Sequence, residues 1–152
     1  MDTPPSYSFC LARWPKEEKD IRAVREQVFI EELSIPPELE WDDRDEACYH
    51  VIAYDEKSRP IATGRVDTDG HIGRMAVLPP WRGRTVGGAV LSYLMHIAER
   101  LDMDYVWVHA QESAIPFYQK NGFSTAGDRF TETGIPHQKL VRLILRKDIA
   151  LQ

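Results

Sequence analysis

A glycine-rich segment directly after a predicted strand carries the residue types best suited to chemistry. In it Gly83, Gly87 and Gly88 alternate with the cations Arg82 and Arg84, and a helical pattern begins at the same point. The first turn of a helix has backbone N–H groups without partners and carries the positive end of the dipole. Because glycines let a ligand approach that backbone closely, we expect a diphosphate site here. The alternative is an ordinary turn with two solvated arginines.

The residue spacing excludes several other kinds of site. The segment lacks the Gly-Lys-Ser/Thr of a Walker A loop and the GxGxxG of a Rossmann fold. Five histidines show no metal-ligand spacing, so we expect no metal. Cys10 and Cys48 stand far apart without a CxxC motif, which favours reduced thiols in a cytoplasmic protein.

A second candidate group is the aromatic pair Phe117-Tyr118. It lies in a short helix predicted over Ser113–Lys120, with Asn121-Gly122 as the C-terminal cap. A phenol can act as a general acid. Aromatic residues at helical spacing more often pack a helix onto a sheet, so residue type alone favours packing.

Together these motifs resemble those of the GNAT superfamily of acyl-CoA N-acyltransferases. Arg82–Gly87 resembles the Gln/Arg-x-x-Gly-x-Gly/Ala loop, with Thr85 where the family usually has glycine; Arg84–Ala89 is a shifted alternative. We expect Thr85 to avoid positive φ. Ala114–Phe123 resembles the Phe-Tyr-x-x-x-Gly-Phe signature. The resemblance implies acetyl-CoA as co-substrate, bound by Met75, Ala76, Val77, Arg82, Gly83, Arg84, Thr85, Val86, Gly87, Gly88 and Tyr118.

Other segments resemble a GNAT subgroup of the ElaA/YjcF type. They are Arg25–Glu32, Asp42–Asp45 with His50, and Gly134–His137, whereas Leu33 replaces the usual glutamine. The resemblance extends from about Arg25 to His137, which is nearly the whole of one domain expected over residues 1–152.

The resemblance implies direct attack of an amine on the thioester, with Tyr118 protonating the departing thiolate. Many relatives place a carboxylate on the fourth strand to accept the amine proton, but His71–Leu78 contains none. The candidates are Glu32, His109 and His137, and the resemblance favours Glu32 and His137. A solvated helix face for Glu32 and a hydrogen-bonded core position for His109 are the alternatives.

The acceptor and other partners are less defined by the sequence. Six acids lie between Glu38 and Glu46, opposed only by Arg44, which indicates either steering of a cationic amine or a solvated acidic loop. We expect a small amine acceptor, and relatives make a homodimer conceivable. A net charge of -5 argues against nucleic acid, and no apolar run reaches the roughly 20 residues that cross a membrane. A CoA-binding sensor without catalysis and a nucleotide-binding domain are the alternative functions.

The elements that must position these residues follow from hydrophobic periodicity. The expected fold class is α/β (α+β), and the resemblance implies a mixed, mostly antiparallel sheet of about seven strands, splayed between strands four and five, with about four helices. The Thr131–His137 excursion joins the last two strands. Strands are predicted over Ser6–Trp14, Tyr49–Tyr54, Pro60–Asp67, His71–Leu78, Tyr105–Ala110, Phe123–Phe130 and Lys139–Arg146, with the longer helices over Lys16–Leu33 and Val86–Leu101.

Overall fold

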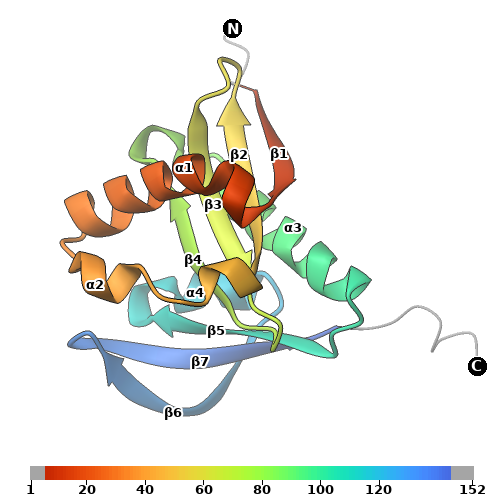
Figure 1. Ribbon diagram of the computed structural model, residues 1–152. Coiled ribbons are helices and arrows are strands. Elements are labelled where there is room, and N and C mark those ends of the chain that lie inside the picture. Colours follow the sequence, from red (N-terminus) through yellow and green to blue (C-terminus); the bar gives the residue numbers. More distant parts are fainter. Residues whose placement is uncertain (1–5, 145–152) are drawn as a thin grey trace, which may run out of the picture.

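Two β-sheets organise the computed structural model, which describes residues 6–144 (Figure 1). The first has the strand order β1-β2-β3-β4 and the second β5-β7-β6, with antiparallel pairing in both. The strands are β1 (Tyr7–Ala12), β2 (Tyr49–Asp55), β3 (Pro60–Val66), β4 (Ile72–Val77), β5 (Tyr105–Gln111), β6 (Ser124–Glu132) and β7 (Ile135–Leu143). The helices are α1 (Trp14–Arg25), a π-helical segment (Glu26–Glu32), α2 (Pro37–Glu40), α3 (Val86–Arg100) and α4 (Ile115–Lys120).

The two sheets meet at one parallel bridge between His71 and Trp107. There the Trp107 amide donates to the carbonyl of Gly70 at 3.0 Å, and the His71 and Trp107 rings stack with centroids 3.9 Å apart. Beyond the bridge, β4 and β5 form no ladder within the described residues. The seven-stranded α/β fold splayed between strands four and five is therefore confirmed.

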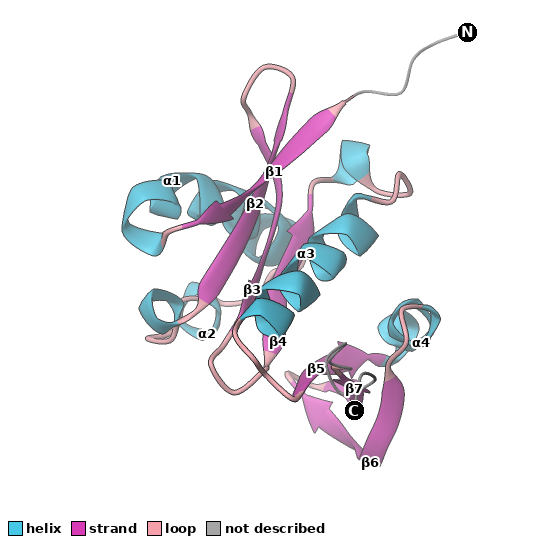
Figure 2. Ribbon diagram, turned by 90° about the vertical axis from the view of Figure 1, so that its right-hand side faces the viewer, coloured by secondary structure: helices cyan, strands magenta, loops and turns pink. Residues whose placement is uncertain are grey.

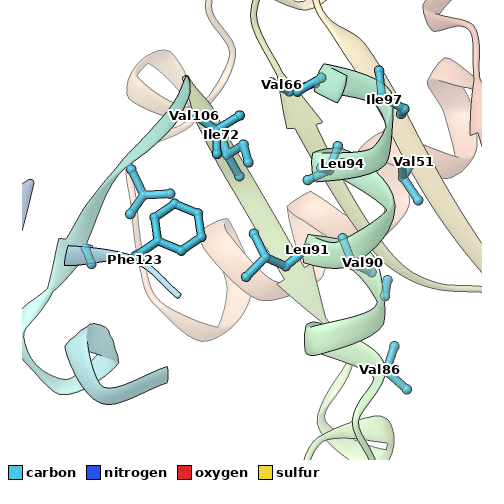
Figure 3. Packing of buried hydrophobic residues seen from close by; sticks show 14 of the residues in the cluster. Val51, Val66, Ile72, Val86, Val90, Leu91, Leu94, Ile97, Val106 and Phe123 are labelled. Atoms are coloured by element: carbon cyan, nitrogen blue, oxygen red, sulfur yellow. The ribbon is translucent and has the colours of Figure 1, made fainter. Parts of the chain in front are cut away.

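Helices cover both faces of the four-stranded sheet, with α1 and α2 on one side and α3 on the other (Figure 2). Apolar residues of α3 recur at three- and four-residue spacing, which gives the helix one buried face. Figure 3 shows this face against the strands, with Leu94 between Ile72 and Val51 and Leu91 between Phe123 and Val90. A Cβ on Gly64 would lie 2.9 Å from side-chain atoms of Leu94 and Val90, so glycine permits the close packing of α3.

The opposite face is covered by α1, whose buried residues Ile21 and Val24 pack with Ile52 and Ala76. The helix begins at Trp14, before the expected Lys16. Pro15 does not prevent this start, because proline is well tolerated in the first turn of a helix. No helix within residues 6–144 has the length and apolar character needed to span a membrane.

The second half of the predicted helix Lys16–Leu33 is π-helical rather than α-helical. Apolar periodicity cannot distinguish the two conformations over so few residues, so the sequence offered no signal for this change. π-Helical turns occur frequently at functional sites. Here the segment carries Glu32 and contributes Val28 and Phe29 to the wall of a pocket described below.

The hairpin of β6 and β7 corrects the expected Thr131–His137 excursion. Thr133 (φ 50°) and Gly134 (φ 75°) alone connect the strands, and two successive residues with positive φ are typical of a tight hairpin turn. His137 consequently lies within β7 rather than in a loop. The predicted strand end at Arg146 lies outside the described residues.

Candidate functional site

The glycine-rich loop connects β4 to α3 and presents exposed backbone at the start of the helix. The hydrogen bond across this junction runs from the Ala89 amide to the Thr85 carbonyl at 3.0 Å. The amides that precede Ala89 in the first turn therefore have no partner inside the helix. Gly83 adopts φ 74°, a left-handed conformation that favours glycine.

Thr85 corrects our expectation about this loop, because it has φ 66° and ψ 4° immediately before α3. A β-branched residue in the left-handed region is strained by about 1–2 kcal/mol. The loop therefore keeps the backbone path that glycine would adopt at this position, and the strain is the consequence of having threonine there.

A pocket of about 550 Å³ opens over the loop. A Cβ added at Gly83 or Gly88 would meet no atom within 4 Å, so both glycines border open space. Arg82 and Lys120 supply the cationic side chains of its lining, whereas the guanidinium of Arg84 lies 6.0 Å from the Trp81 ring centroid. Sequence reasoning missed Lys120, although it ends the helix that carries Phe117-Tyr118.

Arg82 connects this loop to the π-helical segment. Its guanidinium donates to both carboxylate oxygens of Glu32 at 2.7 Å, and its Nε donates to the carbonyl of Val77 at 2.9 Å. The hydrogen bonds from Arg82 lower the pKa of Glu32. The candidate base Glu32 and the candidate diphosphate ligand Arg82 are therefore hydrogen-bonded to each other.

A second pocket of about 600 Å³ lies where β4 and β5 diverge. It shares Val77, Arg82, Gly87 and Phe117 with the loop pocket, so the two pockets are adjacent. A larger hollow of about 930 Å³ lies between α3 and the β6–β7 hairpin and includes neither the loop nor Tyr118. The predicted site residues that line the second pocket are Met75, Ala76, Val77, Arg82, Gly87, His109, Tyr118 and His137.

Tyr118 lines the second pocket, and its hydroxyl donates to the sulfur of Met75 on β4 at 3.8 Å. Its ring makes edge contacts with Phe117 and Phe123, with centroids 5.1 and 5.5 Å away. Burial raises the pKa of Tyr118 to about 12, so its phenol stays protonated at neutral pH. The packing role and a proton-donating role are thus compatible.

The carboxylate of Glu132, a residue of the β6–β7 hairpin, faces the two candidate histidines. Glu132 Oε1 lies 3.5 Å from His109 Nδ1, and Glu132 Oε2 lies 3.5 Å from His137 Nε2. His137 is buried, and its Nδ1 lies 2.8 Å from the carbonyl oxygen of Ile135. Sequence reasoning missed Glu132 because it treated the hairpin as an irregular connection.

The acidic segment 38–46 is opposed by three arginines of other elements, which corrects the expectation that only Arg44 opposes it. Arg25 of α1 donates to Glu40 and Asp45 at 2.7 Å, and all three side chains are almost fully buried. The remaining pairs of this cluster are Arg65–Asp42, Arg65–Asp45, Arg74–Glu40 and Arg74–Asp42. Arginines therefore pair with Glu40, Asp42 and Asp45, whereas Glu38, Asp43 and Glu46 are exposed.

The cysteines and His50 have structural surroundings. Burial raises the pKa of Cys48 to about 12 and also raises that of Cys10, so neither is a thiolate at neutral pH. His50 Nε2 lies 2.8 Å from the carbonyl oxygen of Asp45, and its ring stacks on Trp14. Within residues 6–144, no three His, Cys, Asp or Glu side chains are grouped so as to hold a metal ion.

Comparison with known proteins identifies the family. A family model described as acetyltransferase (GNAT) domain matches residues 18–143. The uncharacterized N-acetyltransferase YjcF of Bacillus subtilis is 32% identical over 136 residues, which cover 87% of this chain and 96% of that protein. An acyl-CoA N-acyltransferase from Pseudomonas aeruginosa matches with a TM-score of 0.81 and 25% identity. Escherichia coli ElaA matches with a TM-score of 0.81 and 22% identity. Each structural match covers 90% of this chain and 99% of the other. The chain therefore belongs to the GNAT family of acetyltransferases, as its loop and Phe-Tyr motifs indicated.

Proposed function

We propose that this chain transfers an acetyl group from acetyl-CoA to a primary amine of a small acceptor. The observation that carries the proposal is the adjacency of two pockets, one over the glycine loop and one beside Tyr118 and His137. A donor with a diphosphate at one end and a thioester at the other would span both pockets. Family membership supports CoA as its carrier.

The diphosphate would be held by the loop amides and by Arg82 and Lys120, which border the glycine-lined pocket. Backbone groups near Met75 and Val77 would pair with the amides of the pantetheine arm. The thioester supplies an activated acyl group, and Tyr118 would hold a proton for the departing sulfur. Holding donor and acceptor in register supplies much of the rate enhancement.

Among the candidate proton acceptors, the geometry favours His137 over Glu32. His137 lines the pocket and has one ring nitrogen directed at a carboxylate. Glu32 is bound to Arg82, which lowers its pKa and makes it a weaker base. The thiols of Cys10 and Cys48 have raised pKa values, which supports direct attack of the amine without a thiol intermediate.

The acceptor would enter on the side of the π-helical segment and the acidic cluster. Phe29, Leu33 and Ile35 supply an apolar wall there, and Arg74 supplies a cation. A pocket of about 600 Å³, partly filled by the donor, suits a small molecule better than a protein chain.

Thiol release from acetyl-CoA over a panel of primary amines tests the proposal. We expect release with at least one amine and about a 100-fold lower kcat for Tyr118→Phe. The rival function, a CoA-binding module without catalysis, draws support from the pairing of Glu32 with Arg82 and the lack of a carboxylate in β4. Calorimetric binding of CoA without turnover for any amine would favour that rival. Absence of CoA binding would exclude both.

A further inference from the structure

Glu132, which no motif singled out, is placed by strand register beside both pocket histidines. His137 lies opposite Phe130 of β6 and opposite Gln111 of β5. Glu132 and His109 each lie two residues from one of those partners, so both are diagonal neighbours of His137 on the same face. The two-residue turn at Thr133-Gly134 determines this register.

The hydrogen bond of His137 to the backbone assigns its tautomer. A carbonyl oxygen can only accept, so Nδ1 must carry the hydrogen in the 2.8 Å contact with the Ile135 carbonyl. In the neutral ring Nε2 then holds a lone pair. A carboxylate at 3.5 Å from Nε2 makes no hydrogen bond to that lone pair, but it can accept a hydrogen bond from an N–H formed there.

We propose that Glu132 is a positioning residue that prepares His137 to accept the proton of the acceptor amine. This inference rests on the proposed function. The amine nitrogen forms its bond to the thioester carbon, and the carbon–sulfur bond breaks. The amine proton moves to His137 Nε2 beside Glu132, and the Tyr118 proton moves to sulfur. Transfer through solvent then returns a proton from His137 to Tyr118, so the overall reaction neither gains nor loses protons.

His109 Nδ1 lies 3.5 Å from the other carboxylate oxygen of Glu132, whose side chain is 47% exposed. The His109 ring packs against Trp107 and Phe130, with centroids 5.0 and 4.7 Å away. An exposed glutamate on a hairpin would ordinarily be mobile. Its contacts with His109 and His137, whose rings both pack against Phe130, give the carboxylate a defined place beside the pocket.

Nitrogen-15 NMR of the histidine side chains tests the tautomer independently of activity. We expect neutral His137 in the full chain to carry its proton on Nδ1, both in the wild type and in Glu132→Gln. A proton on Nε2 would overturn the inference, since that nitrogen would then donate to Glu132 and could accept nothing.

Steady-state kinetics with acetyl-CoA and an amine that supports turnover test the role of Glu132. We expect Glu132→Gln to lower kcat about tenfold to 100-fold, as loss of an orienting partner does, with KM for acetyl-CoA changed less than twofold. Glu132→Asp should recover part of that loss. The matched control is Glu112→Gln, which removes an exposed carboxylate paired with Arg129 of the same hairpin.

Failure of the proposed function and failure of the role of Glu132 give different experimental results. A wild type that releases no thiol with any amine overturns the proposed function and the catalytic part of this inference with it. An active wild type whose kcat survives Glu132→Gln, or falls equally in Glu112→Gln, overturns the role of Glu132 alone.

Discussion

The carboxylate of Glu32 and the guanidinium of Arg82 form a bidentate ion pair with both contacts at 2.7 Å. The pair joins the π-helical segment to the glycine loop across 50 positions of sequence. A diphosphate that binds Arg82 must compete with Glu32, so the two functions expected of these residues are linked through one contact.

Removal of the competing charge should strengthen diphosphate binding. We expect Glu32→Gln to lower the Kd for desulfo-CoA about two- to fivefold, because the pair is solvent-exposed and weak. Isothermal titration calorimetry measures this, with the exposed neighbour Glu31→Gln as control. An unchanged Kd together with a large loss of kcat would instead identify Glu32 as the base.

Thr85→Gly should stabilise the protein. Glycine relieves about 1–2 kcal/mol of the backbone strain that threonine has at positive φ. The greater conformational entropy of glycine in the unfolded chain offsets about 0.5–1 kcal/mol of that gain. The expected net increase in the free energy of unfolding is about 0.5–1 kcal/mol, measured by urea denaturation. Thr85→Ala retains a Cβ and should show no comparable gain. Equal stabilities for the Gly and Ala variants would contradict the strain at φ 66°.

Tyr118 should not determine the alkaline limb of the pH–rate profile below about pH 11. A general acid works only while protonated, and burial raises the pKa of Tyr118 to about 12. Tyr118→Phe should therefore lower kcat at every pH between 7 and about 10 without moving that limb. The ordinary pKa of tyrosine is about 10. An alkaline limb that is centred near that pH and disappears in the variant would contradict the raised pKa of Tyr118.

Arg25→Ala should be strongly destabilising because it leaves Glu40 and Asp45 buried without their common cation. Loss of one partner of a buried ion pair costs about 3–5 kcal/mol. On the same helix, Arg22 forms a partly exposed pair with Glu18, so Arg22→Ala should cost about 1 kcal/mol or less. Chemical denaturation compares the two variants. Similar losses would mean that the buried cluster contributes little.

Contiguous residues were sufficient to predict most of the elements and the glycine-rich turn between β4 and α3. The spacing of apolar residues predicted α3, and Asn121-Gly122 predicted the end of α4, where Gly122 has φ 89°. Local patterns reveal such features because helix periodicity and turn geometry depend on neighbours along the chain. The same reasoning failed at Thr85, where the loop as a whole imposes the backbone conformation.

The sequence by itself determined the fold class, the family motifs and the candidate residues Tyr118 and His137. Only the tertiary structure decided that Glu132 faces His109 and His137, that Glu32 binds Arg82, and that distant arginines pair with three carboxylates of the acidic segment. These contacts join side chains of different elements. They depend on strand register and on helix placement, which arise from packing of the whole chain and leave no signal in the spacing of neighbouring residues.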